Sequence, residues 1–268
     1  MSAVKIVLVE WMGYPLYRNK QIGAHTIKCG LGRLLENIQK LDAGVDFDCR
    51  VIVNEHNNKQ TLTSLIGKQK LLRKFFLNNS KTNSIEKFDH VFQKYPFIEK
   101  VTYRQNIGQD IGAYDFIYRQ LMEENYTGDI LFMNSSVRGP HENGWLKKYQ
   151  DLFNRHENTG LAGITLNSYY STRKKSFDPH VQSFFLYSNM QILKDVFPDG
   201  IYNGQTGEEK RDLIINGEIG ISRKVLDKGY GISCSAFPEF CYKKDDEWTI
   251  PFGDMRFNDQ YKDLTNLI

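Results

Sequence analysis

The spacing of hydrophobic positions along this chain predicts strands alternating with helices. Short runs rich in Val, Ile, Leu and Phe are typical of strands, whereas apolar residues three or four positions apart are typical of helices. The predicted strands cover residues 4–9, 49–54, 101–103, 129–133, 160–166, 182–188 and 232–236. The predicted helices cover residues 24–41, 88–92, 113–121, 145–153, 191–197 and 208–228. This alternation favours an α/β fold.

The stretch from Glu99 to Pro140 predicts a strand, a helix and a second strand. Its last strand, Asp129 to Met133, is an apolar run typical of a strand covered on both faces. The two strands of such a unit are parallel, with a right-handed crossover. Ligands bind beyond the carboxyl ends of parallel strands. The polar segments 106–112 and 134–140 are therefore expected to meet at one edge of the sheet and to form the active site.

Composition favours one ordinary globular domain. The 268 residues are 40% hydrophobic and 25% charged, and we expect a domain over residues 1–242 with a tail, 243–268, packed on it or extending it. No apolar run approaches the roughly 18 residues that cross a bilayer, and no signal-peptide pattern begins the chain. We therefore expect a cytoplasmic protein without a transmembrane segment.

Charge and short motifs narrow the classes of function. A net charge of +3 does not indicate nucleic acid, but it suits a protein that handles anionic sugar nucleotides. The four cysteines are scattered without a CxxC pair, so we expect reduced thiols and no zinc site. The first strand is not followed by GxGxxG, and the chain has no GxxxxGK[ST], which disfavours another nucleotide-using enzyme such as a dehydrogenase or a methyltransferase.

Four short motifs, in this order, resemble GT-A-type glycosyltransferases: 106–113 (NIGQDIGA), 134–140 (NSSVRGP), 179–183 (PHVQS) and 217–222 (GEIGIS). The chain is most similar to the rhamnan-synthesis F-type family and to related eukaryotic and viral glycosyltransferases, over roughly residues 4–235. This resemblance implies a single GT-A (Rossmann-like) domain with a mostly parallel central sheet flanked by helices. It also implies transfer of a sugar from a nucleotide-sugar donor to a hydroxyl of a glycan or glycoconjugate acceptor, in polysaccharide biosynthesis.

The resemblance leaves the metal requirement open. GT-A enzymes usually carry an Asp-x-Asp metal motif where this chain has Asn134, Ser135 and Ser136. Amide and hydroxyl groups orient a ligand but bind Mg²⁺ or Mn²⁺ less well than carboxylates do. We therefore assign no metal ligand. Arg138, His180 and the cluster 173–175 are the candidates for neutralising the charge of the leaving group.

The remaining donor-site candidates follow predicted strands. Glu10 and Trp11 follow the first strand, where the resemblance places the nucleotide base; a surface loop with an aromatic plug is the alternative. Asp110 is expected to hold ribose or sugar hydroxyls, or a metal, although it could also cap the following helix. Asn106 either contacts the donor or only shapes the turn.

Glu218 is the predicted general base of an inverting reaction. The resemblance places the catalytic carboxylate of such enzymes at this helix, facing the donor; simple stabilisation of a helix start is the alternative. His180 is either catalytic or a structural histidine whose hydrogen bonds are satisfied. The competing function is a non-catalytic sugar- or nucleotide-binding relative, because the Asp-x-Asp motif is replaced.

Two further segments have open interpretations. The basic segment 68–74 has apolar residues at helical spacing, which predicts a core helix with a basic solvent face, or alternatively a membrane-surface or nucleic-acid helix. His56 lies among polar residues that end the second strand, in a solvated loop or, alternatively, a metal site.

Overall fold

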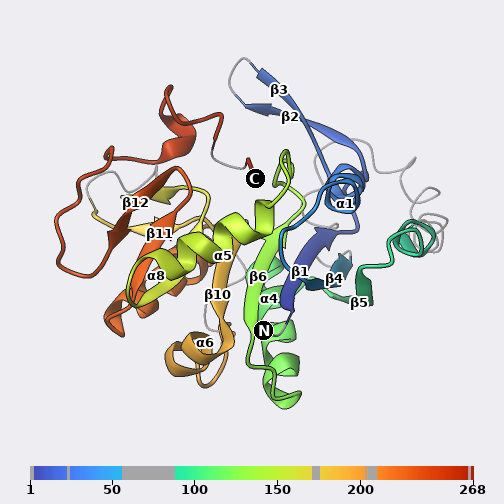
Figure 1. Cartoon of the computed structure of the whole chain (residues 1–268), viewed down its shortest axis with the longest axis horizontal. Helices are drawn as coiled ribbons and strands as arrows, with labels where there is room; N and C mark the ends of the chain where they lie inside the picture. The colour runs from blue at the N-terminus through green and yellow to red at the C-terminus, as the bar shows by residue number, and fades with distance from the viewer. Residues whose placement is uncertain are drawn as a thin grey trace, which may run out of the picture.

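The computed structural model describes residues 3–22, 25–55, 88–170, 176–202, 204, 210–264 and 267–268. Within these residues, one eight-stranded sheet has the order β12-β11-β7-β10-β6-β1-β4-β5 (Figure 1). Its strands are β1 (Val4–Trp11), β4 (Phe47–Glu55), β5 (Ile98–Gln105), β6 (Asp129–Asn134), β7 (Thr159–Gly163), β10 (Phe185–Asn189), β11 (Gly231–Cys234) and β12 (Phe237–Tyr242).

The sheet is mostly parallel, as predicted. β5, β4, β1 and β6 run parallel, and β7 and β11 are parallel to each other. β10 is antiparallel to its neighbours β6 and β7, and the edge strand β12 is antiparallel to β11. The predicted strand–helix–strand unit is β5, α4 (Gln109–Glu123) and β6; its strands are parallel but are separated by β1 and β4.

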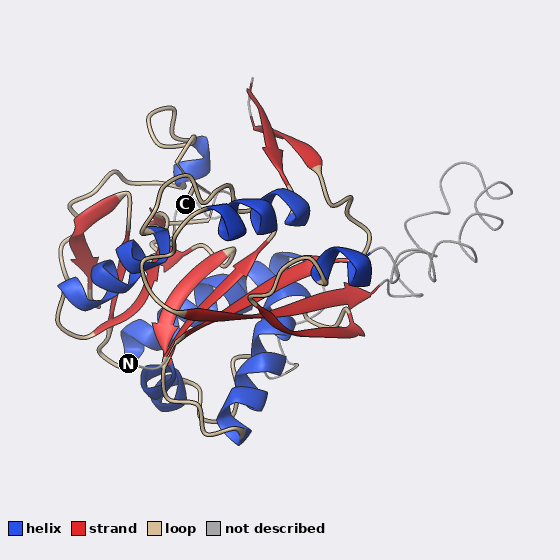
Figure 2. Cartoon of the chain, turned by 45° about the vertical axis from the view of Figure 1, so that its right-hand side comes forward, coloured by secondary structure: helices blue, strands red, loops and turns tan. Residues whose placement is uncertain are grey.

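Helices cover both faces of the sheet and confirm the α/β class (Figure 2). The face with Ile6 and Leu8 of β1 packs against α1 (Leu31–Lys40) and α5 (Trp145–Arg155). The opposite face, with Val7 and Val9, packs against α4, α6 (Met190–Val196) and α8 (Ile219–Asp227). Because alternate residues of β1 and β6 belong to different clusters, both strands are buried on both faces.

The predicted helix 24–41 begins later than expected. A hairpin of β2 (Arg18–Ile22) and β3 (His25–Cys29) precedes it and projects from the body of the protein (Figure 1). Gly30 has φ 111°, a conformation that favours glycine, and a Cβ there would lie 2.5 Å from the carbonyl oxygen of Leu16. The chain therefore turns sharply at Gly30, and the helix starts at Leu31.

Other elements lie close to their predicted positions. The helix 88–92 is present, and the predicted helix 208–228 is described as α7 (Lys210–Asp212), a π-helix (Leu213–Glu218) and α8. The predicted strand 232–236 ends at Cys234, and β12 follows it as one further strand. A short pair, β8 (Leu166–Asn167) and β9 (His180–Val181), lies outside the main sheet.

The tail after residue 242 packs against the domain. Trp248 and Ile250 pack against one hydrophobic cluster, and Ile268 belongs to the other. Met255, at the start of the 3₁₀ helix Met255–Phe257, is fully buried, and its N–H donates to Asn167 Oδ1 at 2.9 Å. The tail therefore contributes to the same hydrophobic core as the sheet.

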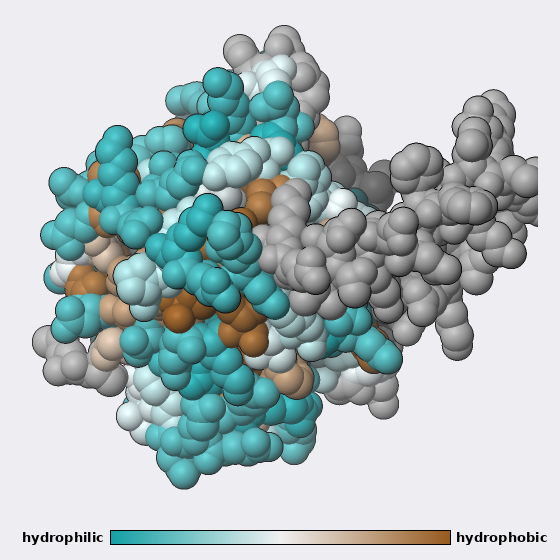
Figure 3. Space-filling view, turned by 90° about the vertical axis from the view of Figure 1, so that its right-hand side faces the viewer, coloured by the Kyte–Doolittle hydropathy of each residue, from teal (hydrophilic) through white to brown (hydrophobic). Residues whose placement is uncertain are grey.

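Three predictions fall outside the described residues: the helix around 68–74, the environment of His56, and the basic cluster 173–175. The described part of the surface in Figure 3 is mostly hydrophilic, with small, separate hydrophobic areas. None of the helices described is long and apolar enough to cross a membrane.

Candidate active site

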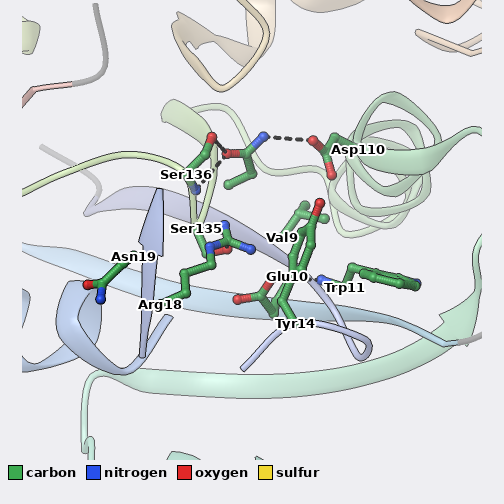
Figure 4. Close-up of a pocket in the computed structure, with 10 residues that line it drawn as sticks. Val9, Glu10, Trp11, Tyr14, Arg18, Asn19, Asp110, Ser135 and Ser136 are labelled. Atoms are coloured by element: carbon green, nitrogen blue, oxygen red, sulfur yellow. Dashed lines mark hydrogen bonds between the residues drawn. The ribbon is translucent and has the colours of Figure 1, made fainter. Parts of the chain in front are cut away.

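A cavity of about 370 Å³ lies at the carboxyl ends of β1 and β6, beside the start of α4 (Figure 4). This is the edge at which the sequence predicts that the two polar segments meet. The cavity is lined by Val9, Glu10, Trp11, Tyr14, Arg18, Asn19, Asp110, Asn134, Ser135 and Ser136. Most of the predicted donor-site residues are therefore in one place.

Asn134 joins the two polar segments. Its Nδ2 donates to Asp110 Oδ2 at 2.7 Å, and its Oδ1 accepts the N–H of Ser136 at 3.0 Å and the Ser136 hydroxyl (Figure 4). Burial raises the pKa of Asp110, and the hydrogen bond from Asn134 opposes that rise. The N-cap of α4 is Gly108, with φ 71°. Asp110 lies in the first turn of the helix, so it is not the capping residue.

Glu10 places a second carboxyl group in the cavity. It is 2% exposed, and its Oε1 accepts the N–H of Trp11 at 2.9 Å. Burial raises its pKa to about 7, against the lowering effects of Ser135 and Arg18. Beside it, the rings of Trp11 and Tyr14 are in edge-to-face contact with centroids 4.9 Å apart. This wall of the cavity thus combines aromatic surface with a carboxyl group that titrates near neutral pH.

Arg18 is a site residue that the sequence did not reveal. It starts β2, and its Nη2 donates to Ser135 Oγ at 2.9 Å, while its guanidinium lies 4.0 Å from the centroid of the Tyr14 ring (Figure 4). The N–H of Gly32 donates to the carbonyl of Leu16 at 2.9 Å, which anchors the base of the hairpin to the start of α1. The prediction of a helix from residue 24 gave no indication of this hairpin.

The polar groups at the end of β6 do not fit a divalent metal. Mg²⁺ and Mn²⁺ need several free oxygen ligands, preferably carboxylates. Here the side-chain oxygen of Asn134 already accepts two hydrogen bonds from Ser136. One carboxylate oxygen of Asp110 accepts a hydrogen bond from Asn134, and the hydroxyl oxygen of Ser135 accepts one from the positively charged Arg18. Among the residues described, no group of three or more His, Cys, Asp or Glu could hold a metal ion.

Glu218 is not among the residues that line the cavity. It ends the π-helix, and its Oε2 accepts the N–H and the hydroxyl of Ser183 at 2.8 and 2.5 Å. The next residue, Phe184, accepts the N–H of Asn134 at 3.1 Å. Segment 183–184 therefore connects Glu218 to the cavity, although Glu218 does not line it. π-Helical turns occur frequently at functional sites.

His180 lies beside Glu218. It is fully buried, its Nδ1 lies 2.6 Å from the carbonyl oxygen of Asp178, and its Nε2 lies 3.9 Å from Glu218 Oε1. A fully buried ring cannot contact a substrate in this conformation. The geometry is that of a structural histidine beside a carboxylate.

The structure does not bring Asn106 and Arg138 into the cavity. Asn106 lies in the turn between β5 and α4. Arg138 lines a separate cavity of about 500 Å³, and its guanidinium donates to the carbonyl of Asp263. That second cavity is also lined by Thr26, Lys28, Arg33, Asn37, Gly139, His141 and Asp263.

Comparisons with known proteins identify a family. A cytidylyltransferase from Leptospira borgpetersenii serovar Hardjo-bovis is 11% identical over 91% of this chain and 77% of its own, with a TM-score of 0.43. A search of curated proteins finds no significant match. Residues 74–239, more than half of the chain, match the model of a family described as rhamnan synthesis protein F. The four motifs and this match agree, and the chain belongs to the rhamnan synthesis protein F family.

Proposed function

We propose that this protein is a glycosyltransferase that moves a sugar from a nucleotide-sugar donor to a hydroxyl of a glycan acceptor. Membership of a polysaccharide-synthesis family supports a transferase that uses nucleotide sugars. The observation that carries the proposal is the hydrogen bond between Asn134 and Asp110, which unites the two polar segments in one cavity. Its place beyond the carboxyl ends of parallel strands is where α/β sheets bind nucleotides.

The groups lining the cavity suit the parts of such a donor. A volume of about 370 Å³ is within the range of small-molecule sites. Trp11 and Tyr14 offer aromatic surface to the nucleotide base, and Asp110 and Asn134 offer hydrogen bonds to hydroxyl groups. The amino-terminal end of α4 carries a partial positive charge that favours phosphate.

Glu218 is the general base in this proposal. The acceptor oxygen attacks the anomeric carbon as its proton passes to Glu218, and the bond from that carbon to the nucleotide diphosphate breaks with inversion. Ser183 holds Oε2 of the carboxylate, and His180 packs behind Oε1. The two hydrogen bonds from Ser183 fix the orientation of the carboxylate before the acceptor arrives.

Replacing Glu218 tests the assignment. Glu218→Gln keeps the shape of the side chain but cannot take a proton, so we expect transfer to fall by about 10²- to 10⁴-fold. Donor binding, measured by calorimetry, is expected to change little because Glu218 does not line the cavity. Glu239→Gln, at an exposed carboxylate paired with Arg155, is the matched control.

The assay measures release of nucleoside diphosphate and formation of the glycosylated acceptor. Turnover by Glu218→Gln at the rate of the Glu239→Gln control would remove Glu218 as the base. Donor binding without any turnover by the unaltered protein would instead identify a non-catalytic sugar- or nucleotide-binding relative.

A further inference from the structure

Arg18 reaches the donor cavity from outside the sheet. It is carried by the β2–β3 hairpin, whereas most other polar groups of the cavity lie at the ends of β1 and β6, just after β6, or in the first turn of α4. Its guanidinium donates to Ser135 Oγ and lies over the Tyr14 ring in a cation–π contact at 4.0 Å. Figure 4 shows this group extending from its strand toward Ser135. Two independent contacts thus hold the cation in the site.

The carboxyl groups around Arg18 are poorly suited to neutralise it. Glu10 and Asp110 interact electrostatically with Arg18, but no ion pair within 4.0 Å is found between Arg18 and a carboxylate in the described part of the chain. Burial raises the pKa of both carboxyl groups, and that of Glu10 reaches about 7, so Glu10 is only partly ionised near neutral pH. The cavity therefore keeps a positive charge available to a ligand.

We propose that Arg18 binds the diphosphate of the donor and takes the place of a divalent metal in this site. The inference rests on the proposed function, and it adds the residue that handles the leaving group. Arg18 contacts Ser135, the middle residue of the segment that replaces the usual metal motif. Guanidinium groups suit this task because their N–H donors match phosphate oxygens in pairs.

The charge balance of the reaction explains why a fixed cation is needed. When the bond from the anomeric carbon to the diphosphate oxygen breaks, its electron pair stays on the diphosphate. The acceptor oxygen forms the new bond to carbon, and its proton goes to the general base. Arg18 offsets the negative charge that develops on the departing diphosphate.

A binding experiment tests the contact without relying on activity. A panel of nucleoside diphosphates (UDP, GDP, CDP and dTDP) and the matching nucleosides is titrated into the unaltered protein, Arg18→Ala, Arg18→Lys and the exposed control Arg155→Ala, all in EDTA. We expect Arg18→Ala to lose about 10- to 100-fold of the preference for diphosphate over nucleoside. We expect Arg18→Lys to keep part of that preference, and the control Arg155→Ala to keep all of it.

Turnover provides the second measurement. With a donor that binds, we expect the unaltered protein to keep its rate after EDTA treatment, and Arg18→Ala to lose about 10²- to 10³-fold in kcat/KM. Diphosphate binding that is equal in Arg18→Ala and the control, or that requires added Mg²⁺ or Mn²⁺ in the unaltered protein, would overturn the role of Arg18 while leaving the glycosyltransferase proposal intact. Absence of binding by every nucleotide would overturn both.

Discussion

Glu10 shows how one buried side chain links the site to the stability of the protein. It lies at the end of β1 with its carboxyl group in the cavity. Burial raises its pKa from 4.5 to about 7. Between these two values the folded protein binds more protons than the unfolded chain, so the free energy of unfolding falls as pH rises. The free energy of unfolding of the protein is therefore highest when Glu10 is protonated.

Replacing Glu10 should remove this pH dependence. At about 1.4 kcal/mol per pKa unit, ionisation of Glu10 costs roughly 3 kcal/mol between pH 4.5 and pH values above 7. We expect Glu10→Gln to lose less stability than the unaltered protein between pH 5 and pH 8, as measured by urea unfolding. Glu239→Gln, at an exposed position, serves as the control. Equal pH dependence in all three proteins would contradict the shifted pKa of Glu10.

At the scale of elements, the sequence predicted that the polar segments after the strands meet at one edge of the sheet. The apolar runs of β1 and β6 show where each strand ends, so Glu10 and Asn134 could be placed at one edge of the sheet from the sequence alone. Asp110 follows the alternating strand β5, which is parallel to both, and reaches the same edge. Arg18 could not be predicted, because β2 and β3 are short, polar and outside the sheet. The support of Glu218 by Ser183 depends on a contact across 35 positions, which local periodicity does not report.

Gly112 tests how α4 is held against the preceding turn. A Cβ on Gly112 would lie 2.0 Å from the carbonyl oxygen of Ile107. We expect Gly112→Ala to destabilise the protein by about 1–3 kcal/mol, because the turn must move, and to weaken nucleotide binding by displacing Asp110. At Gly220, in α8, the nearest atom would be 3.6 Å away. Gly220→Ala should therefore be neutral or stabilise by about 0.5–1 kcal/mol.

Urea unfolding and calorimetric titration of both variants measure these effects. If Gly112→Ala were as stable as Gly220→Ala and bound nucleotide equally well, the close contact between α4 and the turn would not position Asp110.

At the scale of the whole molecule, the tail is linked to the proposed base by a chain of contacts. The tail residue Met255 donates to Asn167, which pairs with His180 in the short β8–β9 sheet. His180 in turn lies beside Glu218. The contact between Met255 and Asn167 spans 88 positions, so the sequence could not place the tail, although it predicted the mostly parallel sheet. The tail is thus linked to the proposed base through Asn167 and His180.

Blocking the cavity tests the proposed donor site most directly. Ser136 lines it and is partly exposed, so Ser136→Trp should fill the space, whereas Ser136→Ala leaves it open. Calorimetric titration with a panel of nucleotide sugars is expected to show a donor that binds the unaltered protein and Ser136→Ala but not Ser136→Trp. Binding of that donor to Ser136→Trp with unchanged affinity, or no binding to the unaltered protein, would contradict a donor site at this edge of the sheet.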